Sequence, residues 1–376
     1  MFTKTALWAL LAGVSSAKLC QNFTVPVSIA TINADFGGVQ TPQTNLDATA
    51  FVLAATRQGG SGTAGAVTGT KAVSGTYNIS AQYCTPNKTA DNSYILQILT
   101  HGIGADKTYW DVSYNNYNYS YVDYALSHGY HTLSYDRVGI GASSHGDPKN
   151  EIQANLEIES LAALTKKARN GELPGIHDKP HKVIHVGHSF GSVQTYAVTA
   201  KYPGLSDGIV LTGFSMNSTF LPWFLIGSGF QQARSGKNPQ NYTAGYLSPA
   251  TPSNVEYNFF YPGSFDPKLL ALTFQTSQPV TIGELLTIGS AAPLQSNFTG
   301  PVLVITGEND IPFCGGDCFA TGGAATSIPA ASKIAFSAAK AFSAIVPPKT
   351  GHGLNWHYTA ASTYKQITNF LGQHGL

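Results

Sequence analysis

The sequence predicts an α/β fold with a mostly parallel central sheet, helices on both faces of that sheet and an inserted helical cap. Three observations lead to this prediction. From residue 93 onward, short and almost wholly apolar runs alternate with helical patterns, as in parallel sheets that are buried on both faces. The chain has 376 residues, of which 43% are hydrophobic, and this is enough for a large buried core. Residues 215–297 break the alternation, and a structureless stretch of that length inside a domain is improbable.

The first residues have the pattern of a signal peptide. Lys4 gives a positive start, residues 6–14 are an apolar run, and residues 15–17 are small residues that suit cleavage after Ala17. The apolar run is far shorter than the ~20 residues that a membrane-spanning helix needs. Residues 208–230 are apolar too, but polar residues and a proline interrupt them, so no stable membrane span is predicted. We therefore expect a secreted, extracellular protein.

Residues 18–92 are predicted to add antiparallel strands and a Gly-rich loop to the edge of the main domain. Residues 23–32 and 74–83 alternate between apolar and polar side chains, which is typical of half-buried strands. Residues 59–69 are rich in Gly and Thr and are expected to form a loop. Residues 50–55 fit either a helical turn or a strand, and both interpretations stay open.

The core of the fold is expected in two blocks, residues 93–214 and 298–376. Apolar runs typical of buried strands occur at 94–99, 131–135, 182–186, 208–212, 301–306 and 344–346. Helical patterns occur at 122–127, 151–169, 192–201, 333–342 and 358–371. Strands that alternate with helices in this order are typical of a parallel sheet.

The expected cap, residues 215–297, is rich in aromatic residues, which outnumber its charged residues by about two to one. These side chains either form the cap's own small core or line a pocket, and for any single residue both interpretations stay open. A pocket covered by such a segment would desolvate an apolar group and offer little to pair a charged one.

Cysteine usage and sequons agree with export. The four cysteines, Cys20, Cys84, Cys314 and Cys318, are an even and sparse set, as expected for disulfides in an exported chain. Three pairings are possible, and we expect Cys20–Cys84 and Cys314–Cys318 because the second pair closes a tiny loop. Asn-X-Ser/Thr sequons, which predict a glycoprotein, begin at Asn22, Asn78, Asn87, Asn118, Asn217, Asn241 and Asn297.

Charge and histidine spacing argue against two other classes of protein. The formal net charge is +1 and only 11% of residues are charged, so nucleic acid is not an expected partner. His177, His181 and His185 recur every four residues, but Pro180 and the following strand break any helix there. We expect surface or packing histidines rather than a metal site, and we predict neither a metal nor a cofactor.

Gly187-His188-Ser189-Phe190-Gly191 is the strongest local signal for chemistry, because it follows an apolar strand and opens a helix. A nucleophile on such a tight strand-to-helix turn needs small neighbours, which Gly187 and Gly191 provide. The Ser189 oxygen would then be exposed at the carboxyl end of the sheet. The amide of Phe190 and the N-terminus of the helix would point at the same spot.

Four further motifs occur in order along the chain. They are His-Gly-Ile-Gly at 101–104, Asp-Arg-Val-Gly-Ile-Gly-Ala-Ser at 136–143, Gly-Glu-Asn-Asp at 307–310 and Gly-His-Gly at 351–353. With these motifs the sequence resembles the α/β-hydrolase superfamily, specifically its secreted lipase/esterase-like serine hydrolases. The cysteine loop after residue 310 and the N-terminal strands depart from the generic pattern of that superfamily.

The resemblance implies a catalytic triad in the chain order serine, acid, histidine. Ser189 would be the nucleophile, and His352 the base that takes its proton. Asp310 would orient His352 and stabilise its protonated form. The oxyanion would be bound by the backbone amides of Ile103 and Phe190.

Alternatives to these assignments stay open in the sequence. Glu308 competes with Asp310 for the role of the acid, because both lie on one loop. His357, five residues after His352, is a weaker alternative base. Asp136 is expected to brace loops rather than to act in catalysis.

The resemblance and the cap together imply a secreted serine hydrolase that cleaves neutral, moderately hydrophobic carboxylic esters or lactones through an acyl-serine intermediate. Its expected partner is a small-molecule ester, and the oligomeric state stays open. A peptidase or amidase of the same fold is one alternative, although the proline-releasing branch usually has Trp where this chain has Phe190. A non-catalytic, ligand-binding member is the other alternative.

Overall fold

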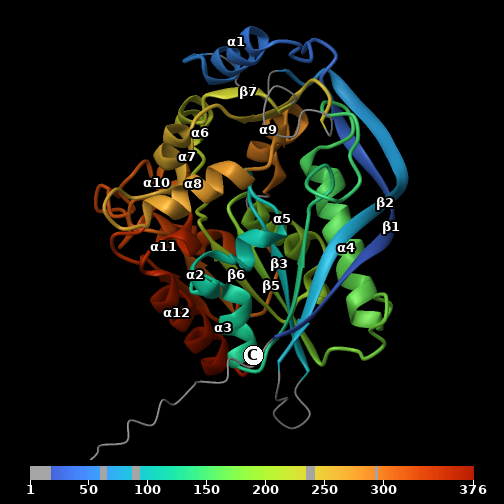
Figure 1. Cartoon of the computed structure of the whole chain (residues 1–376), viewed down its shortest axis with the longest axis vertical. Helices are drawn as coiled ribbons and strands as arrows, with labels where there is room; N and C mark the ends of the chain where they lie inside the picture. Colours follow the sequence, from blue (N-terminus) through green and yellow to red (C-terminus); the bar gives the residue numbers. More distant parts are fainter. Residues whose placement is uncertain (1–17, 60–65, 87–93, 234–241, 293–294) are drawn as a thin grey trace, which may run out of the picture.

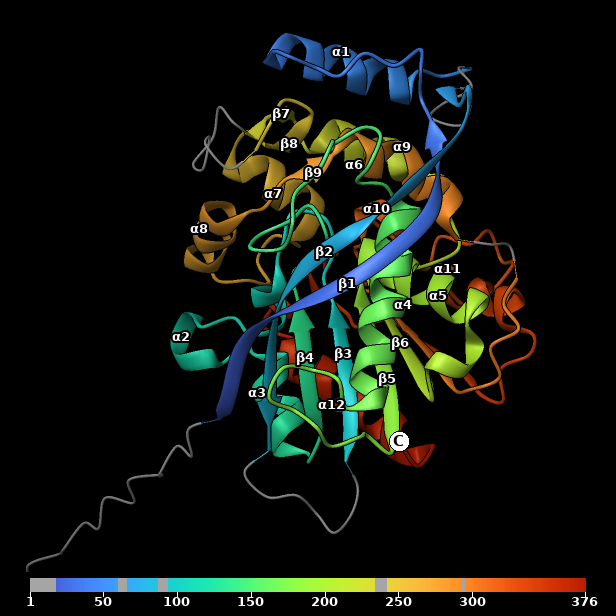
Figure 2. The ribbon, with the colours of Figure 1, turned by 90° about the vertical axis from the view of Figure 1, so that its right-hand side faces the viewer.

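The computed structural model describes residues 18–59, 66–86, 94–233, 242–292 and 295–376 (Figure 1). The expected signal peptide at 1–17 and the sequons at Asn87 and Asn241 lie outside the described residues. An eight-stranded sheet forms the centre of the molecule, with helices on both faces (Figures 1 and 2). The predicted α/β architecture is therefore confirmed.

The central sheet has the strand order β1-β2-β4-β3-β5-β6-β10-β11. Its strands are β1 Leu19–Asp35, β2 Gly69–Thr85, β3 Ile95–Thr100, β4 His131–Tyr135, β5 Lys182–His188, β6 Gly208–Thr212, β10 Val302–Ile305 and β11 Phe342–Ile345. Neighbours from β4 to β11 pair in parallel, whereas β1 with β2 and β2 with β4 pair antiparallel. The parallel strands in the middle are buried on both faces, which explains their continuous apolar sequences.

β1 and β2 form a long antiparallel pair that curves along α4 (Ala154–Asn170) in Figure 2. Buried and exposed side chains alternate along β1, as expected for a strand at the sheet edge. Cys20 lies directly opposite Cys84 in the register, and the two form a disulfide, as predicted. Residues 50–55, for which the sequence allowed either a helical turn or a strand, belong to a helix, α1 (Asn45–Thr56). A capping box at Thr44 stabilises the start of this helix.

Helices cover both faces of the sheet. α4 and α5 (Phe190–Lys201) pack together on one face, and α3 (Tyr121–Ser127) and α12 (Ala360–Gln373) pack together on the other (Figures 1 and 2). α4 ends at Gly171, whose φ of +70° is a left-handed conformation that favours glycine. Among the helices that the structure describes, none combines the length and the apolar character needed to cross a membrane.

The prediction of a helix at residues 333–342 is wrong. The chain instead makes a 3-10 helix at Ser332–Phe336, and β11 begins at Phe342 beside β10. The small residues of this run favour a helix by local propensity, but propensity is a weak preference that tertiary contacts override. Here the parallel pairing of β11 with β10 decides the structure.

Residues 215–297, which we name the cap segment, connect β6 to β10 and lie beyond the carboxyl ends of the parallel strands (Figure 2). Its elements are α6 Leu221–Gly227, β7 Phe230–Gln232, β8 Tyr246–Pro249, α7 Pro252–Phe259, α8 Pro267–Thr276, β9 Val280–Thr281 and α9 Ile282–Ala291. The small sheet β7-β8-β9 was not predicted, because strands of two to four residues leave no periodic pattern. α1 lies against β7 and α6 on the outside of this segment (Figure 1).

Candidate active site

Ser189 lies on a tight turn between β5 and α5. Its backbone adopts φ +55° and ψ −121°, a strained conformation for a residue other than glycine. A Cβ at Gly187 would lie 2.5 Å from Gly191 O, and a Cβ at Gly191 would clash with Thr100 O. Because β5, α5 and the end of β3 approach so closely, both positions need glycine. This local geometry places Ser189 at the carboxyl edge of the sheet.

The structure brings Asp310 and His352 together at the same edge. Asp310 follows β10 and begins α10 (Ile311–Cys314), whereas His352 follows β11. Oδ2 of Asp310 lies 2.6 Å from Nδ1 of His352, and both side chains are fully buried. Oδ1 of Asp310 accepts a hydrogen bond from the N–H of Phe313 at 2.8 Å. Each carboxylate oxygen therefore has a partner, which fixes the orientation of the group.

The contact with Asp310 determines the tautomer of neutral His352. A carboxylate can only accept, so Nδ1 carries the proton and Nε2 keeps its lone pair. Nε2 is buried and has no hydrogen-bond partner among the described residues. A Cβ at Gly213, which directly follows β6, would lie 3.0 Å from the His352 ring, so glycine makes room for the imidazole. The lone pair of Nε2 is thus available to take a proton.

Aromatic rings enclose His352. Its ring centroid lies 4.9 Å from that of His188, 5.5 Å from Phe259 and 5.7 Å from Phe313. His188 in turn stacks on Tyr109 at 4.3 Å, and burial lowers its pKa well below the ordinary value. His188 therefore stays neutral beside His352. Sequence reasoning missed His188, Phe313 and Tyr109 as residues around the site. A signal was present for His188 alone, which directly precedes Ser189 in the chain.

The loop after β3 lies against Ser189. A Cβ at Gly102 would be only 2.7 Å from the Cβ of Ser189. Within the described residues, neither the N–H of Ile103 nor that of Phe190 donates a hydrogen bond. Phe190 is the first residue of α5, where N–H groups have no partner inside the helix. Two free donors thus flank Ser189, and such donors are suited to bind a negatively charged oxygen.

Arg137 links these two flanking segments. Its backbone N–H donates to Nε2 of His101 at 3.1 Å, and its guanidinium lies 4.9 Å from the centroid of the Phe190 ring. The guanidinium is buried and pairs with Glu157 of α4 and Glu284 of α9. Burial alone would lower the pKa of Arg137, but the two carboxylates outweigh it and raise the pKa. A permanent cation therefore joins the sheet, α4 and the cap segment.

Two other carboxylates have partners away from His352. Oε2 of Glu308 accepts from the N–H of Lys349 at 2.9 Å. Asp136 accepts from the Nζ of Lys107 at 2.8 Å and from the N–H of Ala142 at 3.0 Å. Asp310 is therefore the carboxylate that the structure places on His352, and Asp136 holds two loops together.

His357 also has a structural set of contacts. Its Nε2 accepts from the N–H of Tyr261 at 2.9 Å and from that of Gly351 at 3.0 Å, and its Nδ1 donates to Gly353 O at 2.9 Å. Burial lowers the pKa of His357 to about 4. With both ring nitrogens engaged, His357 has no lone pair left for a substrate proton.

The three evenly spaced histidines do not form a common site. His177 and His181 are exposed. His185 is buried, with Thr165 and Ser206 at 2.9 Å from its two ring nitrogens. Across the described part of the chain, no cluster of His, Cys, Asp or Glu has the makings of a metal site.

A cavity of about 160 Å³ adjoins Ser189. Apolar side chains from the core and the cap segment make up most of its wall, among them Val193, Phe214, Met216, Leu221, Phe224 and Ile288. Among the residues that the structure describes, none of those that line it has a charged side chain. The aromatic residues of the cap segment differ in their position relative to the cavity. Phe224 is buried and lines the cavity, whereas Trp223 is 47% exposed.

Comparisons with known proteins agree with this architecture. The matching family model, described as the Alpha/beta hydrolase family, covers residues 97–362. A search of curated proteins found no match. One similar solved structure is that of a malate-bound thermophilic esterase from Thermogutta terrifontis, which is 14% identical in sequence. The match covers 80% of this chain and 95% of the esterase chain, with a TM-score of 0.52.

Two further solved structures have the same fold. One is an alpha/beta hydrolase fold protein from Chitinophaga pinensis, with 15% identity, 78% of this chain and 94% of that chain covered, and a TM-score of 0.50. The other is a protein of Acinetobacter baumannii AYE designated as a lipase, with 14% identity, coverage of 79% and 89%, and a TM-score of 0.50. At these identities the likeness shows the fold alone.

Proposed function

Because the chain belongs to the alpha/beta hydrolase family, we propose that it is a serine hydrolase of neutral, moderately hydrophobic carboxylic esters or lactones. Ser189 is the nucleophile, His352 the base and Asp310 the acid of its triad. The observation that carries the proposal is the 2.6 Å contact between Asp310 and His352, which leaves Nε2 of His352 unpartnered at the edge where Ser189 is presented.

The reaction proceeds in two halves. In the first, Nε2 of His352 takes the proton of Ser189 as Oγ attacks the carbonyl carbon, and Asp310 stabilises the imidazolium. The N–H groups of Ile103 and Phe190 bind the oxyanion. The alcohol then leaves with the proton from His352, and the acyl group stays on Ser189. In the second half, His352 activates a water molecule, which releases the acid and regenerates the serine.

The cavity supports the substrate class. An apolar acyl or alcohol group entering it replaces contact with water by contact with side chains such as Val193, Leu221 and Phe224. A charged group would lose its hydration there and find no counter-charge among the described residues of the wall, which is costly. Neutral and moderately hydrophobic esters are therefore preferred over charged peptides.

The proposal includes export and a division of the chain. Residues 1–17 are a signal peptide, 18–92 belong to the catalytic domain, 93–214 and 298–376 form its core, and 215–297 are the cap. Disulfides persist in oxidising compartments, so the pairs Cys20–Cys84 and Cys314–Cys318 support an extracellular location. Sequons that are exposed on the surface, such as Asn78 and Asn118, are suitable acceptors for glycans.

The experiment that tests this function is a substrate panel. It compares kcat/KM of the purified protein for p-nitrophenyl acetate, butyrate and octanoate, for lactones and for matched aminoacyl anilides. Ser189→Ala serves as the control for background hydrolysis. We expect the esters to react faster than the anilides and the variant to lose the activity. Faster anilide cleavage would favour a peptidase, and binding without hydrolysis would favour a non-catalytic member.

A further inference from the structure

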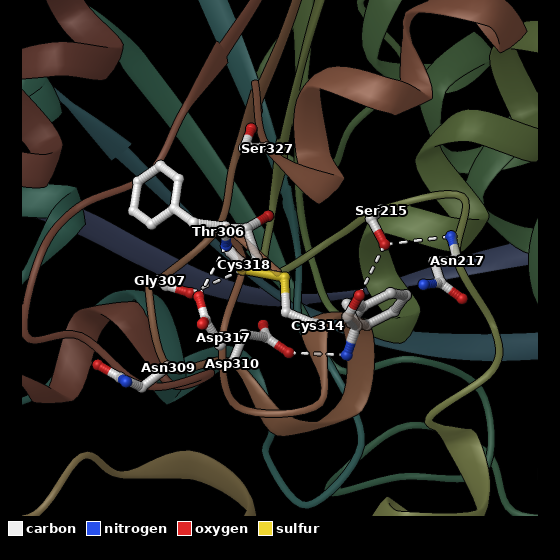
Figure 3. Close-up of a disulfide and its surroundings, with 12 residues drawn as sticks. Ser215, Asn217, Thr306, Gly307, Asn309, Asp310, Cys314, Asp317, Cys318 and Ser327 are labelled. Atoms are coloured by element: carbon white, nitrogen blue, oxygen red, sulfur yellow. Dashed lines mark hydrogen bonds between the residues drawn. A yellow bond between two sulfur atoms is a disulfide. The ribbon is translucent and has the colours of Figure 1, made fainter. Parts of the chain in front are cut away.

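The disulfide Cys314–Cys318 closes a small ring directly after Asp310 (Figure 3). Inside this ring, the N–H of Gly316 donates to the backbone oxygen of Asp310 at 2.8 Å. At its end, the N–H of Cys318 donates to Glu308 O at 2.9 Å. The ring therefore folds back onto Asp310 and onto Glu308, two residues before it, and its two cysteines are buried.

The same turn reaches the histidine and the cavity. Phe313 donates its N–H to Oδ1 of Asp310, stacks its ring on His352 and lines the cavity. Its backbone oxygen accepts from Oγ of Ser215 at 2.9 Å, on the strand-end loop of β6. Figure 3 shows Asp310, Ser215 and the bridge around this one turn. Any loosening of the turn would thus move the partner of His352.

The sequence inside the ring is flexible by itself. Gly315 and Gly316 both have positive φ, +67° and +90°, which are conformations that glycine adopts without strain. Two adjacent glycines give the unbridged chain many alternative conformations, and a disulfide removes most of them. The stability that a ring of this size adds to the whole protein is small, because loop-closure entropy grows with loop length. Its effect is local.

We propose that the Cys314–Cys318 disulfide is a positioning element of the active site, which holds the Asp310 carboxylate on Nδ1 of His352. The inference rests on the proposed function where it concerns rate. With the bridge absent, Asp310 samples orientations that do not reach His352, and the imidazolium formed in the reaction is less stabilised. The turnover therefore falls.

The test compares two variants of this bridge with a matched control. The bridge is removed in Cys314→Ser/Cys318→Ser and in Cys314→Ala/Cys318→Ala. The control, Cys20→Ser/Cys84→Ser, removes the other disulfide, which joins β1 to β2. Cys84 lies opposite Thr132 near the amino end of β4, whereas the site is at the carboxyl ends of the strands. Active sites are counted by fluorophosphonate titration, below the melting temperature of each variant. We expect kcat to fall roughly 10- to 100-fold in the first two variants and to stay near wild type in the control.

A second readout does not depend on ester hydrolysis. The Nδ1 proton of His352, bonded to a buried carboxylate, gives a strongly downfield NMR resonance in protein labelled with ¹⁵N-histidine. We expect this resonance in wild type and in the control, and its loss in both variants without Cys314–Cys318. In an Asp310→Asn background, removing the bridge is expected to cause no further fall in kcat. If Cys314→Ala/Cys318→Ala keeps the resonance and the wild-type kcat, the bridge is only structural and the inference is overturned.

These readouts separate the two hypotheses. Wild type that shows the resonance but hydrolyses no ester contradicts the proposed function, and the bridge variants then still decide the inference by NMR. Hydrolysis of esters with equal kcat in all variants contradicts the inference and leaves the proposed function intact.

Discussion

His357 accepts a hydrogen bond from the backbone N–H of Tyr261 at 2.9 Å, so the loop that carries His352 is bonded directly to the cap segment. A second bond from the N–H of Gly353 to Phe259 O at 2.8 Å runs between the same two segments. Because Phe259 also packs on the ring of His352, the end of α7 touches the histidine and holds its loop. The cap segment is therefore in direct contact with His352 and with the loop that carries it.

Acidification is expected to weaken this arrangement through His357. Its pKa is 6.5 in the unfolded chain and about 4 in the fold, so above pH 6.5 the residue is neutral in both states. As the pH falls from 6.5 toward 4, only the unfolded chain takes up the proton. The free energy of unfolding should then fall by about 3 kcal/mol from this residue alone.

Urea unfolding at neutral pH and at about pH 4.5 measures this loss. His357→Gln, which keeps an acceptor and a donor but does not titrate, is expected to lose less stability over the same range. Equal losses in wild type and in this variant would contradict the assignment to His357.

Glu308 and Asp310, the two carboxylates on the loop after β10, differ in their expected effect on rate. Asp310→Asn replaces an oxygen that accepts from His352 by an amide, which disfavours the reactive tautomer, so kcat should fall by roughly 10³- to 10⁴-fold. Glu308→Gln should cost little, because Glu308 binds the backbone of Lys349 instead. Steady-state kinetics with a butyrate ester checks both. A larger loss for the Glu308 variant would show that the acid is assigned wrongly.

Gly102→Ala is expected to damage the oxyanion donors without removing one. The new Cβ would sit 2.7 Å from that of Ser189, so the loop must shift and the N–H of Ile103 moves with it. We expect kcat to fall roughly 10²- to 10³-fold, as when one oxyanion donor is lost. Gly372→Ala in α12 is the control, because its Cβ meets nothing within 4 Å. Wild-type kcat in the Gly102 variant would speak against this site for the oxyanion.

Phe224 and Trp223 are neighbours in sequence with different expected roles. Phe224 lines the cavity, whereas Trp223 is 47% exposed and lies outside it. Phe224→Leu should therefore raise KM for octanoate esters severalfold and leave acetate almost unchanged, because only the longer chain reaches the altered wall. Trp223→Leu should change neither. Kinetics over an acyl series from acetate to octanoate distinguishes them, and equal effects of the two variants would mean that another cavity holds the acyl chain.

Much of this arrangement was readable from the sequence because it depends on local rules. The buried strands are apolar throughout, and the turn at Ser189 needs glycines at fixed positions. The order of Ser189, Asp310 and His352 along the chain also follows from motifs at the ends of strands.

The remainder depends on packing between distant segments. The sequence run of Lys333 to Phe342 favours a helix, and only the pairing of β11 with β10 overrules it. The aromatic enclosure of His352 by Phe259 and Phe313 brings together two short helices, α7 and α10, which no sequence spacing relates. Likewise, the helical pattern of the cap segment does not reveal which of Trp223 and Phe224 faces the cavity.

The site of covalent labelling tests directly whether Ser189 is the nucleophile. Wild type, Ser189→Ala and His352→Ala are incubated with a fluorophosphonate probe, and the modified peptide is identified by mass spectrometry. We expect a single adduct on Ser189 in wild type, none in Ser189→Ala and much slower labelling in His352→Ala, because the hydroxyl needs its base. An adduct on another residue with Ser189 unmodified, or equal labelling of wild type and Ser189→Ala, would contradict the assignment of Ser189 as the nucleophile.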